Sequence, residues 1–188
     1  MKRTFELVLV EQCAPTLAGV KPASLFRYGS DGIAPIRCSA AHWDRMLAPL
    51  GVRIMIIKEC PASNACMIFV YRASWLERLL TEKHRLLFLK RQGYSPGPVP
   101  QMLGQLSQRL CLEREYPHEI GVFLGYPLAD VVGFIENRGW NYTCCGYWKS
   151  YGDPAAAQKC FARYRSCTDL YKRRYAQGTP LLELVVAA

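Results

Sequence analysis

Cys13 is a candidate nucleophile close to the beginning of the chain. The sequence predicts a buried strand over residues 5–10 and a helical segment that starts at Pro15 and Thr16. Cys13 would then lie between a strand end and a helix start, where the partial positive charge of the helix lowers the pKa of a thiol. We therefore consider Cys13 as a thiolate nucleophile. The more common alternative is that Cys13 is a small buried hydrophobe.

Cys60 follows a second predicted strand, over residues 52–59. Helices between the two predicted strands would make them parallel and would bring Cys13 and Cys60 to the same sheet edge. Ligands of open α/β sheets bind at that edge. Cys60 is therefore a predicted ligand-binding residue, again with simple burial as the alternative.

An imidazole and a carboxylate stand side by side at His118 and Glu119, after Pro117. Such a pair can act as a general acid and base, and the chain has only three histidines. We predict His118 and Glu119 as catalytic residues. The alternative is a pair at a helix start, where Glu119 stabilises the helix dipole.

Three cationic side chains are predicted to meet a negatively charged ligand: Lys21, Arg72 and Lys149. Tyr147 and Lys149 fall in a predicted strand over residues 143–151, where a hydroxyl and an ammonium on one face could dock a phosphate or a carboxylate. The alternative for this segment is a packing unit of Tyr147 with Trp148. The chain has no glycine-rich phosphate loop and no nucleophile elbow, so the sequence assigns no cofactor.

The nine cysteines lack the spacing of a metal site. Zinc ligands usually come in pairs separated by two residues, whereas Cys144 and Cys145 are adjacent and would point to opposite faces of a strand. We predict no metal site from spacing alone. A composite set of Cys13, Cys145 and His118 stays open as an alternative.

The bulk properties bound the class of protein. The 188 residues suit a single domain, residues 1–188, with the proline-rich segment 94–100 as an internal linker. A formal charge of +9 favours an anionic partner. The densest basic cluster, residues 172–174, is short, and the predicted helix near residues 128–135 lacks the polar side chains of a recognition helix, which argues against nucleic acid. These features do not specify an oligomeric state.

The beginning of the chain does not have the pattern of a secretory signal. Glu6 and Glu11 interrupt any apolar stretch, and no uncharged apolar run reaches about 18 residues. We therefore expect a cytoplasmic protein with reduced thiols and without a membrane span.

These residues must be positioned by an α+β fold. We predict a small mixed sheet of about four strands, over residues 5–10, 52–59, 66–72 and 143–151, flanked by helices, with a helix-rich C-terminal half. The predicted helices cover residues 16–20, 23–28, 40–50, 74–91, 99–115, two segments within 118–138, and 153–176. In the last helix, an aromatic stripe that includes Phe161, Tyr164 and Tyr171 is typical of core packing.

Five segments carry a family resemblance: CAPTLAG (residues 13–19), KPASLF (21–26), PHEIG (117–121), LGYP (124–127) and CCGYWK (144–149). Together they resemble the domain-of-unknown-function family 3793 (DUF3793) of anaerobic Gram-positive bacteria, over about residues 7–185. The resemblance implies a stand-alone cytoplasmic protein and no known activity. Members of the family often have a histidine before the motif cysteine. Gln12 stands there in this chain, which leaves His118 as the base for Cys13.

The leading hypothesis is one pocket that binds a small anionic ligand, or a thiol-dependent enzyme built on that pocket. Its predicted residues are Cys13, His118 and Glu119 for catalysis, and Lys21, Cys60, Arg72, Tyr147 and Lys149 for the ligand. One alternative is a thiol-based redox protein or a protein that handles metal or iron. The other is a basic module that binds nucleic acid or a protein partner. The hypothesis depends on distant segments meeting at one hollow.

Overall fold

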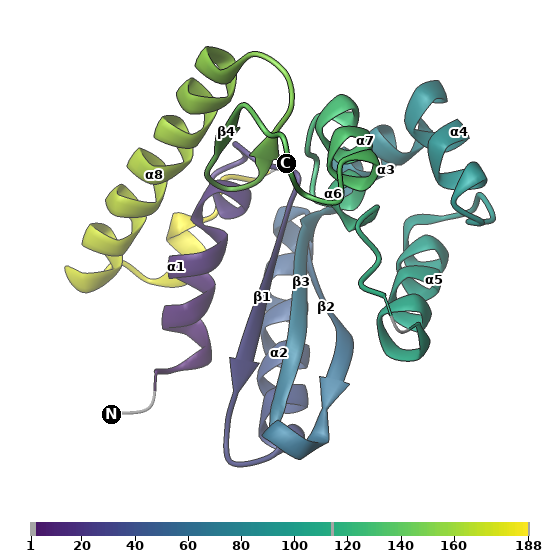
Figure 1. Cartoon of the computed structure of the whole chain (residues 1–188). Coiled ribbons are helices and arrows are strands. Elements are labelled where there is room, and N and C mark those ends of the chain that lie inside the picture. Colours follow the sequence, from purple (N-terminus) through teal and green to yellow (C-terminus); the bar gives the residue numbers. More distant parts are fainter. Residues whose placement is uncertain (1–2, 114, 188) are drawn as a thin grey trace.

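The computed structural model describes residues 3–113 and 115–187. A three-stranded sheet in the order β1-β3-β2 has helices packed on both faces, and a two-stranded hairpin, β4-β5, lies beyond it (Figure 1). This confirms the predicted α+β class with a helix-rich C-terminal half. The sheet is not mixed, because every neighbouring pair of described strands is antiparallel.

The first half of the chain supplies the sheet. Its elements are α1 (Phe5–Leu17), β1 (Ala23–Gly29), α2 (Ile33–Leu47), the 3-10 turn η1 (Ala48–Leu50), β2 (Val52–Cys60), the 3-10 turn η2 (Pro61–Ser63) and β3 (Ala65–Arg72). The second half contains α3 (Ala73–Thr81), α4 (Lys83–Arg91), α5 (Val99–Leu112), α6 (Ile120–Phe123), α7 (Leu128–Glu136), β4 (Cys144–Cys145), β5 (Lys149–Ser150), α8 (Pro154–Ala176) and the 3-10 turn η3 (Leu181–Leu184).

The register of the sheet defines its two ends. Ala23 pairs with Tyr71 and Val52 pairs with Arg72 at one end, while Cys60 pairs with Ala65 at the other. The predicted hairpin of β2 and β3 is confirmed. Its turn is closed by η2 and by Asn64, which adopts a left-handed conformation (φ 46°) that asparagine tolerates.

The prediction was wrong at the beginning of the chain. Residues 5–10 belong to helix α1, whose first turn is capped by Thr4, because its Oγ1 accepts a hydrogen bond from the Leu7 amide (3.2 Å). Helix α1 is buried on most sides, so its apolar run lacks the polar face that identifies a helix. Pro15 lies in its last turn and does not begin a helix, and residues 23–29 form strand β1 where a short helix was predicted.

Two further elements differ from the prediction. The single helix predicted over residues 74–91 is two helices, because Glu82 has an extended conformation (ψ 126°) between α3 and α4. The strand predicted over residues 143–151 is reduced to β4 and β5, each of two residues. The two close helices expected within residues 118–138 are confirmed as α6 and α7.

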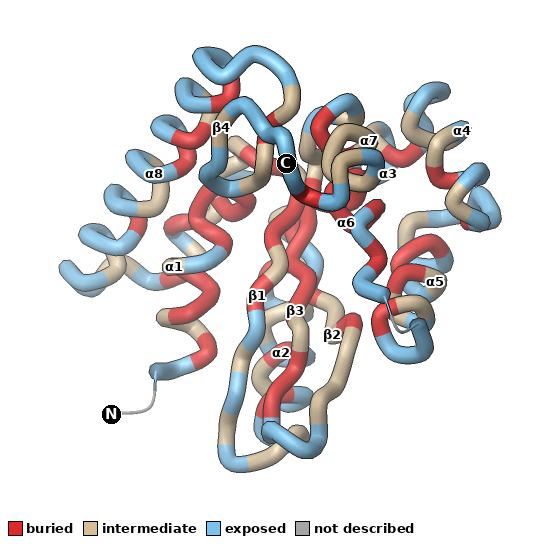
Figure 2. Tube along the Cα trace, viewed as in Figure 1, coloured by how far each residue is buried: buried red, intermediate tan, exposed pale blue. Residues whose placement is uncertain are grey.

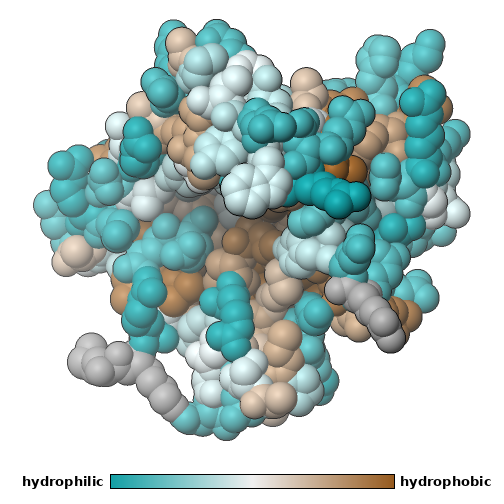
Figure 3. All heavy atoms as spheres, viewed as in Figure 1, coloured by the Kyte–Doolittle hydropathy of each residue, from teal (hydrophilic) through white to brown (hydrophobic). Residues whose placement is uncertain are grey.

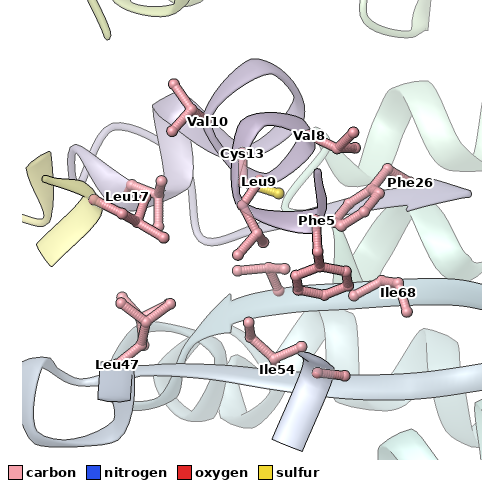
Figure 4. Packing of buried hydrophobic residues seen from close by; sticks show 14 of the residues in the cluster. Phe5, Val8, Leu9, Val10, Cys13, Leu17, Phe26, Leu47, Ile54 and Ile68 are labelled. Atoms are coloured by element: carbon pink, nitrogen blue, oxygen red, sulfur yellow. The ribbon is translucent and has the colours of Figure 1, made fainter. Parts of the chain in front are cut away.

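The core consists of two clusters, one on each face of the sheet (Figure 2). On one face, α1 and α2 pack against the strands, and the cluster includes Phe5, Leu9, Leu17 and Ile68 (Figure 4). On the other face, helices α3, α5 and α6 contribute most of the helical side chains. In this way the sheet separates two apolar layers.

Helix α8 lies against α1 on the outside of the first layer (Figure 1). Asp153 caps it, because Oδ1 accepts a hydrogen bond from the Ala155 amide (2.9 Å). Phe161, Tyr164 and Tyr171 are buried, so the aromatic stripe is packed in the core as predicted. Within the described residues, no helix combines the length and the apolar character needed to cross a bilayer.

Candidate functional site

A hollow of about 170 Å³ lies between α6, α7 and the β4-β5 hairpin. We call it the aromatic hollow, because His118, Tyr126, Phe134 and Trp148 are among the residues that line it. A cavity of about 150 Å³ can hold benzene. The aromatic hollow therefore has room for one six-membered ring.

The rings of the aromatic hollow form two pairs. Trp148 stacks on Tyr126, with centroids 4.9 Å apart and planes inclined by 26°. His118 packs on Phe134, with centroids 4.8 Å apart. Offset and tilted contacts of this kind are favourable between π systems. They also provide faces on which a planar ligand can stack.

Asp130 holds Trp148 and the hairpin in position. Its Oδ2 accepts a hydrogen bond from Trp148 Nε1 (2.6 Å), and its Oδ1 accepts from Ser150 Oγ (3.2 Å) and from the amides of Tyr151 (2.7 Å) and Gly152 (3.2 Å). The residue is only 5% exposed. Because both oxygens already accept hydrogen bonds, Asp130 is suited to positioning the wall of the hollow.

Lys149 supplies a positive charge at the aromatic hollow. Its Nζ donates a hydrogen bond to the Gly139 carbonyl (2.8 Å) and lies 4.9 Å from the ring centroid of Tyr142 and 5.8 Å from that of Phe134. No carboxylate within the described part of the chain forms an ion pair with Lys149. The ammonium therefore has hydrogen-bonding capacity and charge left for an anion.

A second hollow, of about 180 Å³, lies beside the first and shares Tyr126 with it. We call it the Lys21 hollow. Lys21, Ser24, Gln12 and Tyr147 contribute polar groups to its wall, while Leu25 and Leu124 contribute apolar ones. In the space-filling view, hydrophobic residues gather in a recess at the centre of the face shown (Figure 3).

Lys21 is unusually buried for a lysine. It is 6% exposed, and its Nζ lies 5.4 Å from the ring centroid of Tyr126. Burial lowers the pKa of Lys21 to about 8, an effect that the thiols of Cys13 and Cys160 partly oppose. None of the carboxylates in residues 3–113 and 115–187 pairs with it.

Gly125 allows the Lys21 segment to approach Tyr126. Its φ of +77° is in the left-handed region, and a Cβ at this position would lie 2.2 Å from Pro22 Cγ. Only glycine fits both requirements. The close contact between Gly125 and Pro22 therefore brings residues 21–22 next to residue 126.

The comparison with known families agrees with the sequence resemblance. The family model described as "Protein of unknown function (DUF3793)" matches residues 9–185. The chain belongs to the DUF3793 family. No curated protein and no solved structure gives a significant match. Each of the five segments that resemble the DUF3793 family contributes at least one residue to the walls of the two hollows.

The structure brings together some of the predicted site residues of this DUF3793 chain. His118 and Lys149 both line the aromatic hollow, and Lys21 and Tyr147 both line the Lys21 hollow. Tyr147 and Lys149 therefore belong to different hollows, although they are two positions apart. The remaining predicted residues, Cys13, Glu119, Cys60 and Arg72, line neither hollow.

Cys13 lies in the interior of helix α1, where it is fully buried (Figure 4). The expected position between a strand end and a helix start is wrong, so the helix dipole does not favour its thiolate. Burial raises the pKa of Cys13 to about 12, although the Lys21 ammonium and a hydrogen bond with Ser24 act in the opposite direction. The geometry gives no support to a Cys13 nucleophile.

Glu119 belongs to a separate polar cluster. Its Oε1 accepts hydrogen bonds from the Tyr94 hydroxyl (3.0 Å) and from Arg109 Nη1 (3.4 Å). Burial raises the pKa of Tyr94, and the Glu119 carboxylate raises it further. His118 and Glu119 are neighbours in sequence, but their side chains have different partners, so they do not form the expected acid–base pair on one hollow.

The side chain of Arg72 is hydrogen-bonded within the fold. Its Nη1 donates hydrogen bonds to the carbonyls of Thr16 (3.0 Å) and Leu17 (3.2 Å), and its Nη2 donates to the carbonyl of Val186. The guanidinium thus links carbonyls at the end of α1 to the C-terminal segment. Burial lowers the pKa of Arg72.

Cys60 lies at the opposite end of the sheet from Arg72. The strands between these two ends are about 20 Å long, so Cys60 is far from the end where Lys21 precedes β1. The expectation that Cys13 and Cys60 share a sheet edge is wrong, because it required parallel strands and because residues 5–10 form no strand.

The described residues contain no group of three or more His, Cys, Asp or Glu side chains that could hold a metal ion. The composite set of Cys13, Cys145 and His118 is therefore not assembled. All nine cysteines are free thiols in the structure.

Sequence reasoning missed Tyr126, Asp130 and Phe134 as site residues. Tyr126 lies in the LGYP segment that carries part of the family resemblance, and this is the signal that could have identified it. Asp130 is the one acid among the apolar residues 128–135, which is the pattern of a buried carboxylate with specific partners. Phe134 gave no signal beyond its hydrophobicity.

Proposed function

We propose that this protein binds a small planar ring compound that carries a negative charge. The observation that carries the proposal is the ring-sized aromatic hollow with the Lys149 ammonium at its wall. Small-molecule sites are typically concave and largely apolar, with a few polar groups that set orientation. The aromatic hollow has this composition.

The ring of the ligand would be held by stacking. The Trp148 and Tyr126 pair and the His118 and Phe134 pair offer aromatic surface within the same hollow. Because Asp130 fixes the indole of Trp148 through a hydrogen bond, little side-chain freedom is lost when a ligand binds. This preorganisation favours a rigid, flat ligand.

The negative charge of the ligand would be directed toward Lys149. Asp130 also lines the hollow, but its oxygens already accept hydrogen bonds from four donors, so it offers no free acceptor to a cationic group. His118 is exposed and can donate an N–H to the same anion. The formal charge of +9 on the chain also favours the approach of anions.

The proposal uses no thiol. Cys13 is buried with a raised pKa, and no cysteine is among the described residues that line either hollow, so a thiol-dependent enzyme gains no support. The redox and metal-handling alternative gains no support, since the described residues offer no ligand set.

Calorimetry with benzoate and benzamide tests the proposal, because the two probes have the same ring and differ in charge. We expect benzoate to bind at least about tenfold more tightly, which corresponds to about 1.4 kcal/mol. Lys149→Met keeps the apolar stem of the side chain and should remove this preference while benzamide binds as before.

Lys90→Met is the matched control, since it removes one exposed positive charge from α4 without touching the hollow. It should leave both affinities unchanged. Equal binding of benzoate and benzamide by the wild-type protein, or an undiminished preference in Lys149→Met, would contradict the proposal.

A further inference from the structure

The Lys21 hollow is a second site, built from residues that the aromatic hollow does not use except for Tyr126. Its floor and walls come from α1, β1, residue 124 and the β4-β5 hairpin. A primary amine that is 6% exposed lines this hollow, and no carboxylate of the described residues neutralises it. A lysine is rarely buried without a partner, so this arrangement calls for a ligand or a reaction.

We infer that Lys21 is a nucleophilic amine that captures small aldehydes in the Lys21 hollow as an imine. A volume of about 180 Å³ is sufficient for a molecule of a few carbon atoms. Ser24, Gln12 and Tyr147 place a hydroxyl, an amide and a phenol in the same wall. These groups can donate hydrogen bonds to the carbonyl oxygen of the aldehyde.

The surroundings of Lys21 favour its neutral form. The buried ammonium loses hydration, and the aromatic ring of Tyr126 at 5.4 Å replaces it only in part. With a pKa of about 8, roughly a fifth of the amine is neutral at pH 7.4, against about 0.1% for an ordinary lysine. A desolvated lysine of this kind is a recognised type of nucleophile for carbonyl compounds.

The reaction is balanced without a further reactant. The lone pair of Lys21 Nζ attacks the carbonyl carbon, which forms one N–C bond and gives a carbinolamine. The carbon–oxygen bond then breaks, and the oxygen leaves as water with the two hydrogens of the amine. The product is a C=N bond, and no atom is oxidised or reduced.

This inference does not depend on the proposed function. Binding of an aromatic anion uses Lys149 in the aromatic hollow, while imine formation uses Lys21 in its own hollow. Either can fail while the other holds, and the two assays read out different lysines.

The experiment is reductive labelling of the whole protein with propanal and cyanoborohydride at pH 7.4. Peptide mapping by mass spectrometry gives the rate at each lysine. We expect Lys21 to be labelled at least about tenfold faster than the exposed Lys90 and Lys172. A rate at Lys21 equal to or below that of the exposed lysines would overturn the inference.

A variant at the rim separates capture in the hollow from general reactivity. Gln12 is exposed on α1 and lines the hollow, so Gln12→Trp should narrow the entrance without altering the amine. We expect labelling of Lys21 to fall at least about fivefold, with Lys90 unchanged as the internal control. If Gln12→Trp labels Lys21 at the wild-type rate, the hollow is not the site of capture and the inference fails.

Discussion

At the scale of single residues, Lys21 is the side chain whose burial most clearly lowers the stability of the folded state. Its pKa of about 8 lies below the ordinary lysine value of 10.5, so the unfolded chain binds more protons than the folded chain between these two pH values. The free energy of unfolding contributed by this group therefore rises as the pH increases from about 8 to about 10.5. Below pH 8 the buried charge destabilises the fold.

Lys21→Met should consequently stabilise the protein at pH 7, by up to about 3 kcal/mol. The advantage should shrink as the pH approaches 10.5, where Lys21 is neutral in both states of the wild-type protein. Urea unfolding of the two proteins at several pH values measures this difference. A variant that is equally or less stable than the wild type at pH 7 would show that the ammonium is well accommodated.

Residue types alone predicted part of the candidate site. His118 and Lys149 were identified from their chemistry, and the structure brings them to one hollow. The position expected for Cys13, between a strand end and a helix start, is wrong because Pro15 lies in the last turn of α1. Glu119 and Arg72 have chemistry suited to a ligand, but their hydrogen bonds are satisfied within the fold, which a sequence does not reveal.

At the scale of elements, the β4-β5 hairpin is too short to be stable by itself and depends on Asp130. The carboxylate accepts hydrogen bonds from two backbone amides, from one hydroxyl and from the indole of Trp148. Asp130→Asn replaces one acceptor oxygen by a donor, so at least one N–H of the hairpin or the indole loses its partner.

We expect Asp130→Asn to lower the free energy of unfolding by about 2–3 kcal/mol. It should also shift the NMR signal of the Trp148 indole N–H, because the hydrogen bond that fixes the ring is weakened. Asp169→Asn, at an exposed position of α8, changes the net charge equally and serves as the control. Equal stability of the two variants would refute the role of Asp130 in holding the hairpin.

The elements differ in how well the sequence predicts them. Helix α8 and the β2-β3 hairpin were predicted because their patterns are local: an aromatic stripe at helical spacing, and a turn with Pro61 and Asn64 between apolar runs. Helix α1 was missed because burial on most sides removes the polar face. The strand predicted over residues 143–151 was too long, because the shape of the short β4-β5 hairpin depends on a carboxylate from α7.

At the scale of the whole molecule, the two hollows form where distant parts of the chain meet. The Lys21 hollow combines residues of α1 and β1 with Tyr126 and Tyr147, and the aromatic hollow combines His118 with residues of α7 and the hairpin. Tyr126 is the common wall. No sequence pattern specifies this meeting, because it depends on how the two layers of helices pack on the sheet.

The most direct measurement is a crystal structure of the protein soaked with benzoate. We expect a ring in the aromatic hollow, stacked between the aromatic walls, with the carboxylate within about 4 Å of Lys149 Nζ. Benzoate bound only at other surfaces, or bound in the hollow with its carboxylate turned away from Lys149, would contradict the proposal that this hollow binds a planar anion through Lys149.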